Sequence, residues 1–306
     1  MKSIIEEIVE MGAWVDASYK RSDLHEFNTL MQLGVETGNH LRKLAIATFG
    51  SMTEEEAAAG EETFELHDAV IVGHMVRIYK LYDQLVYFVA EDKGEIASIF
   101  SRLLFEAYVI MKYLIVKGAS STDNFIKVSF KSTVRQYNFI KGLEAQRPLT
   151  DIETRIIQKI ENRLKNVGLN ASELSANKSW NLDGLTFKAI VDFLSQRDPN
   201  SRFWALSYDF LYGNMSSSIH GLWYDLEISH LDRRGDRYSP KGKYDRVDPR
   251  FILPASLIPV IACKDYLAWR RSDPDNFLTG VLDKFFDLLL FLNEMDEIRI
   301  GKQGAT

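Results

Sequence analysis

Apolar side chains recur every three or four positions along most of the chain, which is the spacing of a helix face. The clearest example covers residues 67–90, and the most apolar stretch covers residues 96–116. We find no segment that combines a two-residue alternation with hairpin turn residues. The pattern therefore predicts an all-α fold, a multi-helix bundle with a charged irregular loop near the C-terminal third.

Proline and turn residues delimit the other helices. We expect these helices at 24–49, 125–144, 151–167, 187–196, 201–219, 254–271 and 276–295. Thr150 should cap the helix that begins at Asp151, with Glu153 at the capping-box position. Residues 166–184 and 230–250 are expected to be irregular, because the first is rich in Asn and Ser and the second is highly charged.

The domain organisation follows from length and from the lack of linkers. We expect an N-terminal helical segment at 1–65 and a main helical domain at 66–300, packed together as one compact unit. A chain of 306 residues is long enough to bury a full hydrophobic core. No apolar run is both long and free enough of charge to predict a membrane span. We see no secretory signal at the acidic, amphipathic start.

The only cysteine is Cys263, which lies in the apolar run IPVIACKDYLAW and is expected to be buried. One cysteine cannot form an intramolecular disulfide, and this suits a reducing compartment. We therefore expect a cytoplasmic protein.

The chain carries a net charge of −6, which argues against a general nucleic-acid coat but permits one local basic site. The candidate for such a site is the charged loop, whose basic residues are Arg233, Arg234, Arg237, Lys241, Lys243, Arg246 and Arg250. Arginine forks suit phosphate, and Tyr238 and Tyr244 could stack on bases. Four aspartates within the same loop favour the alternative, a solvated segment without a ligand.

Familiar cofactor and metal motifs are missing from the sequence. Neither GxGxxG nor GxxxxGK[ST] occurs, and there is no HExxH, CxxC or EF-hand loop. Three pairs have helical spacing but no evident third ligand: Glu36 with His40, His67 with His74, and Glu227 with His230. We therefore predict no cofactor and no metal.

The strongest polar constellation joins two segments. In RLLFEAYVIMKYL, Arg102 and Glu106 are four positions apart on a very apolar helix, which predicts a buried pair. In YDFLYGNMSSSIHG, Ser217 and His220 are three positions apart. Further residues expected around them are Tyr208, Tyr212, Gly213, Gly221 and Tyr224, with Arg135 and Tyr137 from a third helix.

Two interpretations of this cluster remain open. A hydrogen-bonded network would lock the helical core, because buried polar groups need partners. Alternatively the cluster is an active site or ligand pocket. His220 would then act as general acid or base, Arg102 would stabilise an anion, and Glu106 would orient one of them.

These two segments resemble a bacterial all-helical family, domain of unknown function 5677, over roughly residues 66–225. The resemblance implies a helical bundle and leaves activity open. A more distant resemblance is to HEPN helical bundles, many of them ribonucleases of toxin or antiphage systems, which carry Arg-x4–6-His on one helix and dimerise. Here the residues four to seven before His220 contain no arginine. Arg102 would have to supply the cation from another helix.

We therefore expect a helical regulatory or interaction protein, associated with antiphage defence as far as the resemblance implies. The alternative is a HEPN-like metal-independent ribonuclease that uses His220 with Arg102. A ligand-binding bundle would use the same pocket. A homodimer or a protein partner fits the hypothesis of a regulatory or interaction protein. An RNA partner is expected only for the ribonuclease, and no membrane is expected.

Overall fold

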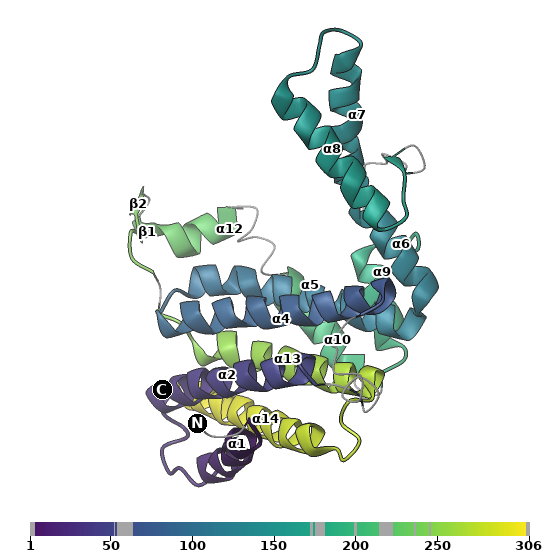
Figure 1. The fold of residues 1–306 in the computed structure, drawn as a ribbon. Helices are drawn as coiled ribbons and strands as arrows, with labels where there is room; N and C mark the ends of the chain where they lie inside the picture. Colours follow the sequence, from purple (N-terminus) through teal and green to yellow (C-terminus); the bar gives the residue numbers. More distant parts are fainter. Residues whose placement is uncertain are drawn as a thin grey trace.

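The computed structural model describes residues 4–51, 53, 64–171, 174, 181–198, 201–213, 223–235, 237–244 and 246–303. It confirms the all-α bundle. Figure 1 shows three layers: α4 (Leu66–Ala90) beside α5 (Gly94–Lys117), then α2 (Phe27–Phe49) beside α13 (Pro249–Arg270), then α14 (Phe277–Gln303) with α1 (Ile4–Ser18). One cluster of buried side chains runs through these layers, from Ile8 to Leu292.

Helix α13 occupies the middle of the bundle and contacts α2, α4, α5 and α14. We expected it to begin at Pro254, but it begins at Pro249, with the Asp248 side chain accepting a hydrogen bond from the Arg250 backbone. Pro254 and Pro259 lie inside the helix, where neighbouring helices enclose them. By length and composition α13 could cross a membrane, but 61% of its apolar window is buried inside the protein, as in a core helix.

Small residues bring α2 close to its neighbours. A Cβ atom on Gly34 would stand 2.8 Å from Ile252 Cγ2, and one on Gly38 would stand 2.7 Å from Val86 Cγ2. Beside this contact the Tyr82 hydroxyl and the Ser256 hydroxyl share a buried hydrogen bond of 2.7 Å between α4 and α13. Cys263 is also buried, as expected, and burial raises the pKa of its thiol to about 12.

Three further helices differ in extent from the expected ranges. The segment expected at 125–144 is two helices, α6 (Ala119–Ser129) and α7 (Lys131–Glu144), separated at Phe130. Ser129 Oγ bonds the Phe125 carbonyl at 2.7 Å, a side-chain contact that competes with regular helix geometry. The final helix, α14, extends eight residues beyond the expected end at Met295. The helix expected at 201–219 changes character at Tyr208, as described below.

An arm of two helices stands away from the bundle (Figure 1). It consists of α7 and α8 (Asp151–Asn166) and joins the bundle through α6. Its buried side chains form a set separate from the bundle core: Val134, Ile140, Ile157, Ile160 and Leu164. The arm therefore depends on its own small apolar contact rather than on the main core.

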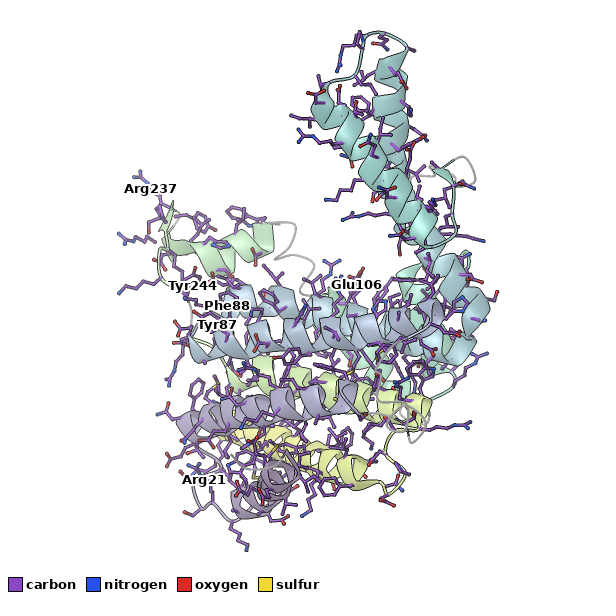
Figure 2. The ribbon with its side chains drawn as sticks, in the orientation of Figure 1. Arg21, Tyr87, Phe88, Glu106, Arg237 and Tyr244 are labelled. Carbon is purple, nitrogen blue, oxygen red and sulfur yellow. The ribbon has the colours of Figure 1, made fainter. Side chains whose placement is uncertain are left out.

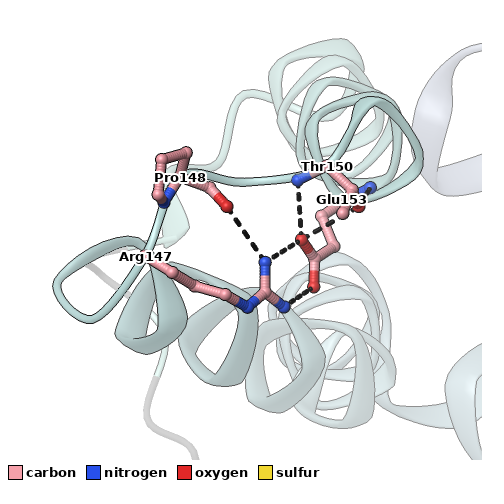
Figure 3. A network of polar contacts seen from close by, with 4 residues as sticks. All are labelled: Arg147, Pro148, Thr150 and Glu153. Atoms are coloured by element: carbon pink, nitrogen blue, oxygen red, sulfur yellow. Dashed lines mark hydrogen bonds and ion pairs between the residues drawn. The ribbon is translucent and has the colours of Figure 1, made fainter.

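The turn at the tip of the arm is tied by a polar network (Figure 3). The expected capping box is confirmed: Glu153 N donates to Thr150 Oγ1 at 3.3 Å, and Thr150 N donates to Glu153 Oε2 at 2.8 Å. The Arg147 guanidinium donates two hydrogen bonds, of 2.9 and 2.6 Å, to the same carboxylate. The Arg147 guanidinium and the Thr150 backbone lower the pKa of Glu153 to about 2. This network fixes the path of the chain between the two helices.

The charged loop contains a short β-hairpin, so the expectation of an irregular segment is wrong there. Strands β1 (Leu231–Arg234) and β2 (Arg237–Pro240) pair antiparallel. Between them lies Gly235, whose φ of +61° suits a tight hairpin turn. The Gly-Asp pair between the strands was an available signal, but the strand residues are charged rather than alternating.

Candidate functional site

Arg102 and Glu106 lie on α5, and both are partly buried. The spacing puts them on one side of the helix, yet the expected ion pair does not form. The Arg102 guanidinium carbon instead lies 4.4 Å from the centre of the Tyr212 ring, in a cation–π contact. Glu106 lies on the side of α5 from which the arm and the hairpin extend (Figure 2).

The Arg102 guanidinium is incompletely satisfied. Its Nε and Nη1 atoms are buried and have no hydrogen-bond partner among the residues that the structure describes. A buried charged donor without a partner costs about 1–3 kcal/mol or more, so an unpaired one needs a physical explanation. An anion held against this guanidinium would remove that cost, which makes Arg102 a candidate for binding an anion.

Three aromatic rings from two elements, α9 and η2, stack beside Arg102. Phe187, the first residue of α9 (Phe187–Ser195), stacks on Tyr212 with ring centres 4.4 Å apart, and Tyr212 stacks on Tyr208 at 5.3 Å. Lys188 lies over the Tyr208 ring at 5.0 Å. The stack therefore has two cations on its rings, Arg102 over Tyr212 and Lys188 over Tyr208. The two tyrosines were expected here from the sequence, but Phe187 and Lys188 were not, because their only signal is their place at a helix start.

The two tyrosines belong to a π-helical segment, η2 (Tyr208–Gly213), which follows α10 (Ser201–Ser207). A second π-helical segment, η3 (Leu226–His230), follows the short α12 (Trp223–Asp225). Such segments are rare and frequently occur at functional sites. The two segments bracket the part of the sequence that contains Ser217 and His220. Those two residues lie outside the described part of the chain.

Trp204 anchors α10 and therefore the start of η2. It is 1% exposed, its ring stacks on Tyr108 of α5 at 5.5 Å, and its Nε1 donates to Asp198 at 3.0 Å. The Tyr108 hydroxyl donates to Asp265 of α13 at 3.0 Å, and Lys112 pairs with the same carboxylate. Burial, with the nearby Asp265 charge, raises the pKa of Tyr108 well above its usual value, so it stays protonated.

Other predicted residues do not join this cluster. Arg135 and Tyr137 lie on α7 in the arm, and Tyr137 donates to Glu161 at 3.0 Å, so they contribute nothing to Arg102. Tyr224 has no described side chain. The basic residues at 233, 234 and 237 lie on the hairpin, while Lys241 Nζ donates to the Ile228 carbonyl at 3.0 Å and Lys243 is exposed.

The histidine pairs have separate surroundings. His40 lies against Trp14, with ring centres 4.6 Å apart, and burial lowers its pKa. Burial, with a contribution from Arg77, lowers the pKa of His74 to about 4. His67 contacts Asp123 at 2.7 Å. In the described ranges no three His, Cys, Asp or Glu side chains gather closely enough to hold a metal ion.

The fold and the cluster together define an all-helical bundle protein with a cation–aromatic site beside a π-helical segment. The model of a family of unknown function, DUF5677, matches residues 68–238, more than half of the chain, and the chain belongs to that family. No curated protein and no solved structure matches the chain. The matched residues run from α4 to β2 and include Arg102, Tyr212, Ser217 and His220.

Proposed function

We propose that this chain is a regulatory or interaction protein of the bacterial cytoplasm, with a role in antiphage defence, and that the arm is its partner-binding element. The observation that carries the binding role is the exposure of apolar side chains on the arm. Phe139 of α7 is 68% exposed and Ile152 of α8 is 63% exposed, the highest values among the large apolar residues that the structure describes.

The position of these side chains supports the proposal. They lie on a pair of helices that projects from the bundle (Figure 1), where a partner can reach them without disturbing the main core. The tip network holds the arm in one shape, so binding need not order a flexible loop. A partner that covers Phe139 would gain about 1.5–3 kcal/mol from that side chain alone.

The cytoplasmic part of the proposal is supported by the lone, buried Cys263. The bacterial and antiphage parts come from the family resemblances rather than from the fold. Neighbouring genes for a nucleotidyltransferase or a restriction enzyme would strengthen the defence role.

A photo-crosslinking experiment in the bacterium that encodes the chain tests the arm. The benzophenone amino acid p-benzoylphenylalanine is placed at Phe139 and, as a control, at Tyr87 of α4, an aromatic residue that is 50% exposed on the bundle. We expect a discrete crosslinked adduct from position 139 and none of that mass from position 87. Adding Ile152→Ser to the chain with the probe at 139 should weaken the adduct. No adduct at 139, or the same adduct at 87, would contradict the role of the arm.

A second function, metal-independent ribonuclease, is favoured by the buried Arg102 guanidinium, which has two nitrogens without a described hydrogen-bond partner and contacts η2, the segment that precedes His220 in the sequence. The cation–aromatic stack would bind the phosphate and an unstacked base, and His220 would transfer the proton.

An assay of RNA cleavage in the presence of EDTA tests this second function. If it holds, His220→Gln and Arg102→Gln should each lower the cleavage rate at least about 100-fold. Each variant should keep the stability of the wild type within about 1 kcal/mol. The interaction proposal predicts no cleavage by the wild type. Cleavage that disappears in both variants would place the ribonuclease first.

A further inference from the structure

The β1–β2 hairpin carries an unbalanced pair of positive charges. Arg234 and Arg237 are direct cross-strand partners, and like charges in that position repel each other. Within the described residues no carboxylate forms an ion pair with either arginine. Arg237 points away from the bundle into solvent (Figure 2). A hairpin that holds two arginines together, with no described carboxylate paired to either, is suited to bind an external anion.

The acidic groups nearby are mostly occupied by other partners. Asp225 is 8% exposed and lies 3.5 Å from His230, Glu227 accepts a hydrogen bond from Tyr238 at 2.9 Å, and Asp248 pairs with Arg250 at 2.8 Å. Asp232 is exposed, but its cross-strand partner is Ser239 rather than an arginine. The described acidic side chains near the hairpin therefore leave Arg234 and Arg237 without an ion-pair partner, while Asp236 and Asp245 lie outside the described residues.

Aromatic rings lie on the other face of the hairpin, together with Arg233. Trp223 is 57% exposed and meets Tyr238 edge to face, with ring centres 5.5 Å apart. Tyr238 is 40% exposed and is held in place by its bond to Glu227. Its cross-strand partner is Arg233, so ring and guanidinium share one face of the hairpin. Arg234 and Arg237 share the opposite face.

We propose that this hairpin, with Trp223, is a binding site for single-stranded nucleic acid. Guanidinium forks bind phosphate oxygens, and exposed indole and phenol rings stack on bases. Bases in a duplex are already stacked on each other, so the rings favour an unpaired strand. An acidic protein surface would use the same arginines, and the polyglutamate competitor below distinguishes that outcome. The inference goes beyond the proposed role of the arm and does not depend on it.

The whole chain has a net charge of −6, so we expect nucleic acid to bind at the hairpin and not over the general surface. Because the contacts are to phosphates, the affinity should fall as the salt concentration rises. The affinity is measured by fluorescence anisotropy with labelled oligouridylate and oligothymidylate of about ten nucleotides, within the site size of single-strand binding folds. The two probes distinguish RNA from DNA. A duplex of equal length and a polyglutamate peptide serve as competing polyanions.

The charge of the hairpin is tested with Arg234→Gln/Arg237→Gln. This double variant removes a repulsion, so the hairpin is expected to persist. Binding should weaken about tenfold or more, and the slope of log K against log salt should fall by about 1.4, from about 0.7 for each lost phosphate contact. The matched control is Lys20→Gln/Lys80→Gln, which removes two exposed lysines near α1 and on α4. Its affinity should change less than about twofold, because distant charges are screened.

The aromatic contribution is tested separately with Trp223→Ala. Loss of one stacked base should weaken binding at least about fivefold without changing the salt slope. Three results would overturn the proposal. The first is that the wild type does not bind the oligonucleotides at low salt. The second is that the hairpin and control double variants lose affinity equally. The third is that polyglutamate or the duplex binds as tightly as the single strand and that Trp223→Ala has no effect on affinity. The last result would indicate an acidic partner or a general polyanion surface.

Discussion

Replacing Asp296 with alanine should lower the free energy of unfolding by about 3–5 kcal/mol, the usual cost of breaking a buried ion pair. Asp296 is 2% exposed and Arg299 is 8% exposed, and Arg299 Nε donates to Asp296 Oδ1 at 2.8 Å on α14. Without this carboxylate the Arg299 charge stays buried. The Arg299 guanidinium would keep only the longer ion pair with Asp248, at 3.6 Å, and the cation–π contact with the Phe27 ring among its contacts described here.

Urea unfolding followed by far-UV circular dichroism measures this loss. The matched control is Asp283→Ala on the same helix, where the side chain is 53% exposed and pairs with Lys264 at 2.5 Å. An exposed pair contributes about 0–1 kcal/mol, so this variant should unfold close to the wild type. Equal losses in the two variants would show that burial does not set the strength of the Asp296 pair.

The second large effect is expected for Trp204→Ala, at about 3–5 kcal/mol, because a fully buried aromatic side chain leaves a cavity when it is removed. The variant also loses the stack on Tyr108 and the hydrogen bond to Asp198. Because Trp204 holds α10, the tyrosines of η2 should lose their alignment with Arg102.

Thermal and urea unfolding of the variant test this expectation. Trp223→Ala provides the same substitution at a side chain that is 57% exposed, and its stability should stay within about 0.5 kcal/mol of the wild type. A Trp204 variant as stable as the Trp223 variant would mean that α10 is not anchored by this side chain.

Local sequence signals predicted the elements that depend on local physics. The 3.6-residue apolar period gave the helices of the bundle, and Thr150 with Glu153 gave the start of α8. The start of α13 was placed too late because proline usually interrupts a helix, and only the surrounding bundle makes two internal prolines tolerable. The hairpin was missed because its strands are exposed on both faces and lack alternation.

The candidate site could be predicted only in part. Spacing placed Arg102 and Glu106 on one side of α5, but an i,i+4 pattern does not show which partner a side chain prefers. Tyr212 reaches Arg102 from a segment distant in sequence, through a π-helical turn that no short motif indicates. The direction of the arm likewise depends on the break at Phe130, so Arg135 could not be excluded from the cluster beforehand.

The central position of α13 has a consequence for synthesis of the chain. The α4–α5 pair packs against α13, yet α5 ends at Lys117 and α13 begins only at Pro249. At about 5–20 residues per second, a ribosome needs on the order of 10 s to make the intervening residues. Throughout that interval the inner faces of α4 and α5 have no α13 to cover them. The nascent chain is therefore expected to engage a holding chaperone until α13 emerges from the exit tunnel.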